Sequence, residues 1–392
     1  MDESLSERLA DRLTGGRPRD RKRLDALVQV SQAIGSIVDR HELIRTIVRE
    51  LTLVFEADRT SFYLHDPKRS ILWTQVAEGL EHWPGRFEID DDEGICGHVF
   101  GKRKTLYIHD VMQDPRFARD IAATTGYYPR SMLVAPVTHV SGRCDGVLQV
   151  MDRQVGHFTK DDVPLIGAIA VLVGISLENS RLHLQQKRQF DSFVRAMSAA
   201  LDARDSTTAI HSINVANYAM GIGQRLNLDP DEIESLRIAG LLHDIGKIGV
   251  PEKVLTKPGK LTRDEFERMK KHAADSRKIL SQIEFIDPLK GLDFVAAAHH
   301  EKLDGSGYPD GLAGDQIPLK SRILAVADIF DALTQTRHYR GEMKTAKALA
   351  IIDEMTPHQL DSRCVTALKR FLGQPPDVVH PGAKGVARKP SE

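Results

Sequence analysis

The chain has little of what marks secreted, membrane-spanning or DNA-binding proteins. Cysteine is scarce, with only three among 392 residues. Cys96, Cys144 and Cys364 lie far apart and form no CxxC pair, which excludes a disulfide framework and fits a reducing compartment. The formal net charge is -1, so no overall positive field favours binding to DNA.

Long hydrophobic runs are also missing. The longest, from Leu165 to Leu177, is shorter than the ~20 residues that a membrane-spanning helix needs. The first residues, MDESLSERLADRL, are acidic and alternating, unlike a signal peptide. A basic run from Arg17 to Arg23 is interpreted as a solvated tail rather than a recognition arm. We therefore expect a cytoplasmic protein with no membrane and no DNA as partner.

The first half of the sequence mixes helical and strand patterns. Residues 25–56 carry apolar side chains at helical spacing, and Asp39 with Glu42 resembles a capping box. Short segments with strand composition follow, separated by turn residues: 59–65, 71–77, 104–109, 131–138 and 146–152. A helical run from 162 to about 201 completes an α+β half.

The second half, from Asp191 onward, shows almost no strand signal. Helix starts stand at Asp229, which precedes a proline, and at Thr262, which Glu265 follows three positions later. Further helices are expected over 319–334 and 344–355. The pattern therefore predicts an all-α second half.

The continuous helix over 165–201 has two interpretations. Its apolar residues recur near heptad spacing, but Asn179, Gln186 and Gln189 interrupt the seam. The helix either packs on its own domain as a linker, or forms a parallel dimer stalk that carries a signal from the first half to the second.

Histidine is abundant, with 16 residues, and several histidines stand near aspartates in the second half. The candidate metal ligands are His211, His243, Asp244, His272, His299, His300 and Asp328. Five imidazoles and two carboxylates suffice for two divalent ions when one carboxylate bridges, and mixed ligation of this kind favours Fe or Mn. Two such ions can clamp a phosphodiester for in-line displacement by water. From the spacing alone, the alternative is that these histidines have no common role.

The motifs HDIGK (243–247) and HHEKLDGSGYP (299–309) together resemble the HD-GYP family of bacterial phosphodiesterases. The similarity continues through RDSTTAIHS (204–212) and IPLKSRILAVADIFDALTQTRHYR (317–340). It implies hydrolysis of cyclic di-GMP to linear pGpG, in some members on to GMP. It also implies that the seven candidates are metal ligands, with Asp244 as the bridge. The alternatives are another cyclic dinucleotide, such as cyclic GMP-AMP, and a protein that binds the messenger without cleaving it.

The resemblance also assigns roles outside the ligand set. It places Lys247 near the scissile phosphate as a catalytic residue beside Asp244, where a cation stabilises developing charge. It implies that Arg337 and Arg340 bind the phosphates or guanines of the substrate, because the fork geometry of the guanidinium suits both groups. Taken singly, the lysine is a solvated cation and the arginines are surface charges at a helix end.

The glycine-rich loop after the paired histidines is implied to border the substrate. Gly305 and Gly307 shape this loop, and Gly307, Tyr308 and Pro309 are expected to contact the substrate. Tyr308 either stacks on a base or only packs the loop.

Two positions depart from the family pattern. Thr207 stands where members with a third metal have a glutamate, so we expect two ions. Asn214 stands where the family usually has an arginine, and we expect it to remove an ion pair.

The first half resembles a GAF domain, a sensory module with an antiparallel sheet flanked by helices. The motifs are GICGHVF, IHDVMQDPRF, TGYYPRSMLVAPV and GVLQVMDRQVGHFTKDD, within about 30–180. The resemblance implies an unknown small-molecule ligand. A residue pattern of GAF domains that bind cyclic nucleotides is kept in outline, with altered residues, at Asp152-Arg153, Phe158 and Asp161-Asp162. The alternative is that these residues form only a structural salt bridge.

These patterns together predict a sensor joined to an effector. We expect a GAF domain that regulates the phosphodiesterase, and a homodimer through the GAF and linker helices. The predicted parts are a mobile segment (1–24), the GAF domain (25–180), a linker helix (181–200), an all-α HD-GYP domain (201–372) and a disordered tail (373–392).

Overall fold

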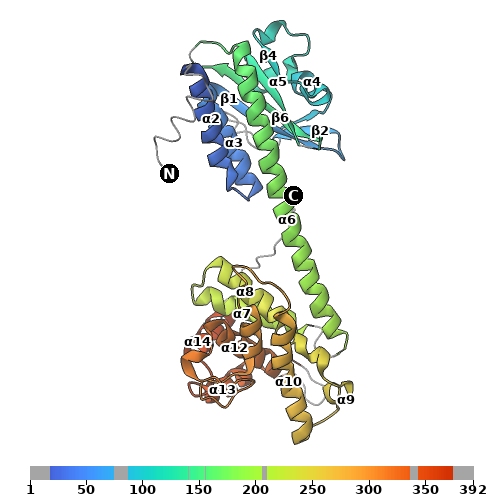
Figure 1. Cartoon of the computed structure of the whole chain (residues 1–392), viewed down its shortest axis with the longest axis vertical. Helices are drawn as coiled ribbons and strands as arrows, with labels where there is room; N and C mark the ends of the chain where they lie inside the picture. Colours follow the sequence, from blue (N-terminus) through green and yellow to red (C-terminus); the bar gives the residue numbers. More distant parts are fainter. Residues whose placement is uncertain are drawn as a thin grey trace, which may run out of the picture. The chain divides into compact units, whose positions relative to one another are not determined.

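The computed structural model divides the chain into two compact units, Met1–Arg188 and Gln189–Glu392. Figure 1 shows both units. The structure describes residues 18–74, 87–139, 141–154, 156–204, 210–335 and 343–373. The predicted tail beyond Gly373 lies outside the described residues.

The first unit is built on a six-stranded sheet with the order β3-β2-β1-β6-β5-β4. Neighbouring strands all run antiparallel. The strands are β1 (Ala57–Asp66), β2 (Ile71–Thr74), β3 (Phe87–Asp90), β4 (Leu106–Ile108), β5 (Met132–Thr138) and β6 (Cys144–Arg153). Five of them confirm the predicted strand segments to within a few residues.

Helices cover both faces of this sheet (Figure 1). They are α2 (Pro18–Gly35), α3 (Arg40–Phe55), α4 (Gly94–Lys102), α5 (Arg119–Thr125) and α6 (Val163–Asp202). Because side chains alternate along a strand, Phe62 and Leu64 of β1 pack with α2, α3 and α6, whereas Tyr63 packs with α4 and α5. The α+β prediction for this half is confirmed.

The structure differs from the sequence prediction at several short elements. Residues 18–24, which we expected to be mobile, form the first turns of α2. The helical pattern over 25–56 corresponds to two helices, and the helix start expected at Asp39 is confirmed, because its side chain accepts the N–H of Glu42. The elements β3, α4 and α5 were not predicted, since they are too short to show a clear period.

Helix α6 confirms the predicted helix from 162 to about 201. Over 160–201 it is the one described helix that is long and apolar enough to cross a membrane, and half of its apolar window is buried inside the protein. Ile166, Ile169 and Val173 lie in the core of the first unit. This burial is that of a core helix in a globular domain.

The second unit is helical, as predicted. Its helices are α7 (His211–Arg225), α8 (Pro230–Leu242), α9 (Glu252–Leu255), α10 (Arg263–Leu280), α11 (Leu292–Ala297), α12 (Leu319–Thr334), α13 (Thr345–Met355) and α14 (Ser362–Leu372). Capping boxes at Asp229 and Thr262 open α8 and α10 at the predicted places. Among the described residues of this unit, the only β pairing is an isolated bridge between Asp304 and Ala313.

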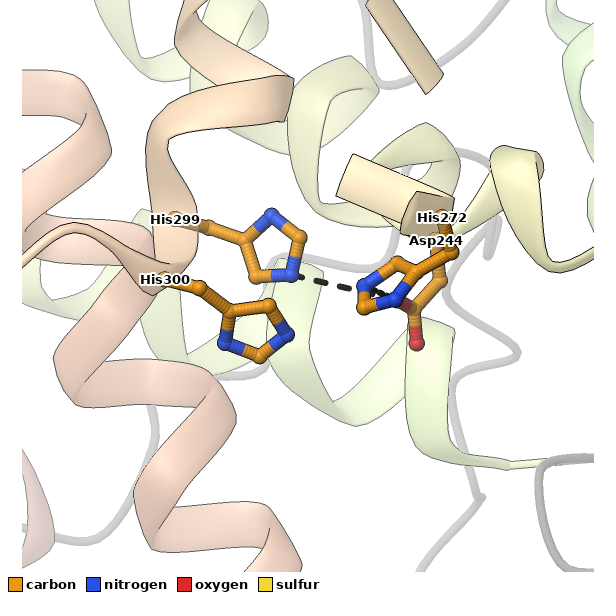
Figure 2. A group of neighbouring side chains, drawn as sticks. All are labelled: Asp244, His272, His299 and His300. Carbon is orange, nitrogen blue, oxygen red and sulfur yellow. Dashed lines mark ion pairs between the residues drawn. The ribbon is translucent and has the colours of Figure 1, made fainter. Parts of the chain in front are cut away.

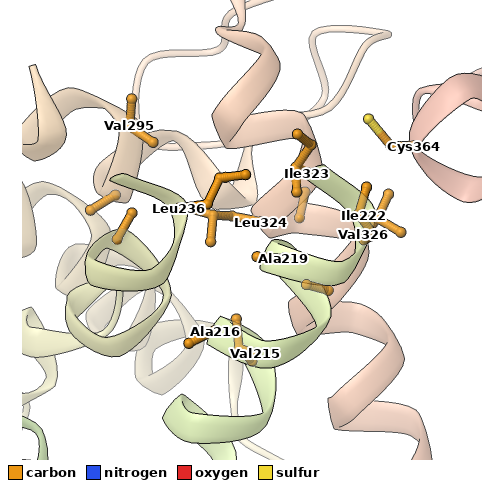
Figure 3. Packing of buried hydrophobic residues seen from close by; sticks show 14 of the residues in the cluster. Val215, Ala216, Ala219, Ile222, Leu236, Val295, Ile323, Leu324, Val326 and Cys364 are labelled. Atoms are coloured by element: carbon orange, nitrogen blue, oxygen red, sulfur yellow. The ribbon is translucent and has the colours of Figure 1, made fainter. Parts of the chain in front are cut away.

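The core of this unit joins α7, α8, α11, α12 and α14 (Figure 3). Helices α7 and α8 approach closely where a Cβ on Gly240 would lie 2.6 Å from the Cα of Ala216. A short connection joins the two helices, so the start of α7 lies beside the end of α8. That geometry brings His211 next to His243.

Candidate metal centre

The first two candidate ligands come from the ends of this helix pair. His211 is the first residue of α7 and His243 follows the last residue of α8. Their ring centroids are 5.4 Å apart. Asp244 comes next and leads into the 3-10 turn η3 (Ile245–Gly249).

The turn η3 packs directly on α10, which carries His272. A Cβ on Gly246 would lie 2.0 Å from the carbonyl oxygen of His272, so only glycine fits this contact. The Ser276 hydroxyl accepts the N–H of Gly246 at 2.9 Å and donates to the carbonyl oxygen of His243 at 2.8 Å. Asp244 and His272 are thereby held side by side.

The remaining candidates come from the end of α11 and from α12. His299 and His300 follow α11 in a 3-10 turn, and Asp328 lies on α12. The hydroxyl of Ser321, on α12, donates to the carbonyl oxygen of Val295, on α11, at 3.0 Å. This bond fixes the two helices next to each other.

The seven candidate ligands form two groups, and Asp244 lies between them. One group holds Asp244, His272, His299 and His300 (Figure 2), and the other holds His211, His243 and Asp328. Within each group the ligand atoms all lie within 4.8 Å of one another. Asp244 reaches both groups, with Oδ1 3.2 Å from His272 Nε2 and Oδ2 3.3 Å from His243 Nε2.

Three of the imidazoles share one hydrogen-bond arrangement. The Nδ1 atoms of His243, His272 and His299 lie 2.8, 2.6 and 2.5 Å from the carbonyl oxygen three residues earlier. A carbonyl oxygen only accepts, so Nδ1 carries the proton and Nε2 keeps its lone pair. These three Nε2 atoms are buried and find no hydrogen-bond partner among the described residues.

Those lone pairs face the oxygens of Asp244. Besides the two contacts above, Nε2 of His299 lies 3.8 Å from Oδ1. Two acceptors that face each other in a buried site are costly unless a cation lies between them. The donor set therefore fits divalent cations, and its mixture of imidazole and carboxylate suits metals such as Fe and Mn.

The ionisation of the site agrees with a cation-binding role. Burial opposes charge on Asp244, yet the charge of Lys247 holds the pKa of its carboxyl well below its usual range. Burial lowers the pKa of His300 to about 4, so this imidazole is neutral near pH 7 and free to act as a ligand.

His211 is the exception among the imidazoles. Burial opposes its charge, but hydrogen bonds to Asp328 and Asp331 raise its pKa to about 9. Its Nε2 lies 3.3 Å from Asp328 Oδ1, and its Nδ1 lies 2.6 Å from Asp331 Oδ2. A proton on Nε2 would occupy the position that a metal ion takes, and metal binding would displace it.

The predicted substrate contacts fall partly within the described residues. Lys247 Nζ lies 2.5 Å from Asp244 Oδ2. The Tyr308 ring lies 4.7 Å from the His300 ring, centroid to centroid. A Cβ on Gly307 would lie 2.5 Å from the Cα of Glu301, so the loop folds tightly back on the ligand segment. Pro309 follows in the same loop and is half-buried. Arg337, Arg340 and Thr207 lie outside the described residues.

Sequence reasoning missed three polar residues that hold the ligand segments in place without being candidate ligands. Asp331 bonds His211, Ser276 joins η3 to α10, and Glu301 accepts the N–H groups of Asp310, Gly311 and Leu312 at 2.7, 3.1 and 3.0 Å. The one signal for Asp331 was its position three residues after Asp328, on the same helix face.

Comparison with known proteins identifies both halves of the chain. A GAF domain model matches residues 39–177, and an HD domain model matches residues 180–364. The 3'3'-cGAMP-specific phosphodiesterase 3 of Vibrio cholerae serotype O1 is 45% identical over 187 residues, which are 48% of this chain and 40% of that protein. The cyclic di-GMP phosphodiesterase response regulator RpfG of Xanthomonas campestris pv. campestris is 36% identical over 249 residues, 62% of this chain and 61% of that protein.

The fold and the site thus define an α+β domain followed by a helical domain with a candidate two-metal centre. The first is a GAF domain and the second is an HD domain, which the motifs HDIGK and HHEKLDGSGYP place with the HD-GYP proteins. The chain spans less than two thirds of the length of either relative.

Proposed function

We propose that the HD domain is a metal-dependent phosphodiesterase that hydrolyses cyclic di-GMP to linear pGpG. The observation that carries the proposal is the pair of ligand groups joined by Asp244, with three buried Nε2 lone pairs that face its carboxylate. The names of the relatives support the substrate class, since they are phosphodiesterases for cyclic di-GMP and for 3'3'-cGAMP.

The seven candidate ligands would hold two divalent cations, which when bound supply Lewis acidity to water and to the phosphate oxygens. Lys247 moves its charge from Asp244 towards the scissile phosphate and stabilises the transition state. Tyr308, beside His300, borders the substrate, and Arg337 and Arg340 hold its phosphates or guanines.

The experiment is a product assay on protein loaded anaerobically with Mn or Fe. We expect cyclic di-GMP to be converted to pGpG, with activity lost on chelation and in His272→Ala. The exposed His358 gives the control, since His358→Ala removes an imidazole outside both ligand groups. Turnover by the chelated protein would contradict the metal mechanism. Tight binding without product in the loaded protein would instead indicate a messenger-binding protein.

A second candidate substrate is a mixed cyclic dinucleotide. The relative at 45% identity is specific for 3'3'-cGAMP. Turnover of cyclic di-GMP and 3'3'-cGAMP measured side by side on the same preparation separates the two. A higher kcat/KM for 3'3'-cGAMP would replace the first proposal.

We also propose that the GAF domain regulates the HD domain by binding a small molecule. A cavity of about 70 Å³ lies between the sheet and α5, and Arg59, Ser61, Tyr127 and Gln149 supply polar groups to its apolar lining. The test is the phosphodiesterase rate of the full chain and of Arg59→Ala in the presence of candidate metabolites. A ligand that changes the first rate and not the second supports this cavity.

A cytoplasmic homodimer completes the proposal. Val28 on α2 and Val171, Ile175 and Leu182 on α6 are exposed apolar side chains, which suits a helical interface between two copies. Sedimentation of the full chain should give a dimer, and Val171→Glu with Ile175→Glu should give monomers. A monomeric wild-type protein would contradict this interface.

A further inference from the structure

The contact between α7 and α12 contains a carboxylate that is not among the candidate ligands. Asp331 is 1% exposed and lies one helical turn after Asp328 on α12. His211 and Asn214 have the same spacing on α7. Because residues three apart share a helix face, the two pairs meet across the contact.

The hydrogen bonds across this contact run in one direction. Nδ1 of His211 donates to Asp331 Oδ2 at 2.6 Å, and Nδ2 of Asn214 donates to Asp331 Oδ1 at 2.9 Å. Both oxygens of the carboxylate are therefore used. The amide of Asn214 fixes the plane of the carboxylate without neutralising its charge, so the charge remains directed at His211.

His211 thus differs from the other buried imidazoles of the site. The Nδ1 atoms of His243, His272 and His299 donate to neutral backbone carbonyls, whereas that of His211 donates to a charged side chain. A carboxylate behind an imidazole fixes its orientation and raises its basicity as a ligand, an effect worth about 10–100-fold in metal affinity.

The two ligand groups consequently differ in charge. The group of His211, His243 and Asp328 has a carboxylate of its own, shares Asp244 and is supported by Asp331. The other group has three imidazoles and only the shared Asp244. The cation of Lys247, 2.5 Å from Asp244 Oδ2, offsets only one of the two carboxylates, Asp328 and Asp331, that the His211 side has besides Asp244. Attraction for a divalent cation is therefore greater on that side.

We propose that Asp331, held by Asn214, is a positioning residue that makes the His211 group the tighter of two unequal metal sites. This inference rests on the proposed metal-dependent function. It predicts that the two cations bind in order, with the His211 group filled first.

The test is an anaerobic titration of metal-free full-length protein with Mn(II), followed by electron paramagnetic resonance. We expect two classes of site in the wild-type protein. Asp331→Asn keeps an acceptor for His211 and removes the charge, so it should weaken the tighter class by about 10–100-fold. Asn214→Ala should weaken the same class to a smaller extent. A titration of Asp331→Asn that superimposes on that of the wild type, or one in which only the weaker class shifts, would overturn the proposal.

Controls separate positioning from general damage to the fold. Asp353→Asn removes a surface carboxylate paired with Lys369 and should leave both classes unchanged. The melting temperature of the metal-free variants shows whether they fold, and if Asp331→Asn does not fold, Asn214→Ala is judged by the same criterion. No nucleotide enters the titration, so a wild-type protein that binds two ions but cleaves no cyclic dinucleotide would refute the proposed function and leave this inference standing.

Discussion

The hydroxyl of Ser276 donates a hydrogen bond of 2.8 Å to the carbonyl oxygen of His243. The same hydroxyl accepts the N–H of Gly246, so one buried side chain satisfies both ends of the turn that carries Asp244. A residue on α10 therefore determines where the shared carboxylate lies, although it contacts no candidate ligand atom.

Replacement of that serine tests this connection. Ser276→Ala leaves a buried carbonyl oxygen and a buried N–H without partners, which should lower the free energy of unfolding by about 1–3 kcal/mol. Urea unfolding followed by far-UV circular dichroism measures it. Ser281→Ala, at the exposed end of the same helix, should have little effect. Equal losses in the two variants would contradict the role given to Ser276.

Glu301 should hold the glycine loop in the same way that Ser276 holds the turn. In Glu301→Gln one acceptor oxygen becomes an amide donor that faces backbone N–H groups, so we expect a loss of about 1–3 kcal/mol in unfolding free energy. If the loop borders the substrate, KM should also rise. The comparison is Glu267→Gln, whose side chain is 57% exposed. An unchanged KM would show that the loop takes no part in substrate binding.

Lys247 is expected to act on the transition state rather than on the metals. Lys247→Met should lower kcat by about 10²–10³-fold, while the metal content of the purified protein stays at the wild-type value. Lys253→Met, an exposed lysine on α9, serves as the control. If metal content falls together with kcat, the lysine acts by holding Asp244 and not through the phosphate.

The stability of the GAF domain should depend on pH through Glu178. Hydrogen bonds from Arg181 and Arg143 lower the pKa of this carboxyl to about 2, against an ordinary value of 4.5. A carboxyl whose pKa is lower in the folded state stabilises the fold above pH 4.5, and this stabilisation is lost as the pH falls towards 2. Glu178→Gln should therefore destabilise the domain at pH 7, with a smaller difference from wild type at pH 3.

Tryptophan fluorescence can follow this difference. The chain has two tryptophans, Trp73 and Trp83, and both belong to the first unit. Urea unfolding at several pH values then reports on the GAF domain within the full chain. A difference between variant and wild type that is the same at pH 7 and pH 3 would show that the arginine pairs contribute nothing.

Local signals in the sequence anticipated much of the second unit. The starts of α8 and α10 depend on Asp229 and Thr262, whose side chains bond to N–H groups three residues away, and such bonds are encoded within one turn of chain. The first unit was harder to predict because β3 and α5 are short, and strand pairing such as Phe62 with Leu148 links residues far apart.

The candidate ligands show where sequence reasoning reached its limit. Their spacing alone did not distinguish a metal centre from histidines without a common role, and the resemblance supplied the set. The structure brings all seven together, but that they bind metal stays a prediction. Arg337 and Arg340 also stay predictions, because they lie outside the described residues.

Which side chains are available for chemistry, and where most helices of the second unit begin, could be predicted from the amino-acid sequence, because capping and helical period act over a few residues. Which carboxylate accepts a hydrogen bond from which imidazole depends on the packing of the helices. Asp331 and His211 are 120 positions apart, and nothing local to either residue specifies the other. Their contact exists because close packing of α7 and α12 places a buried donor where it must find an acceptor.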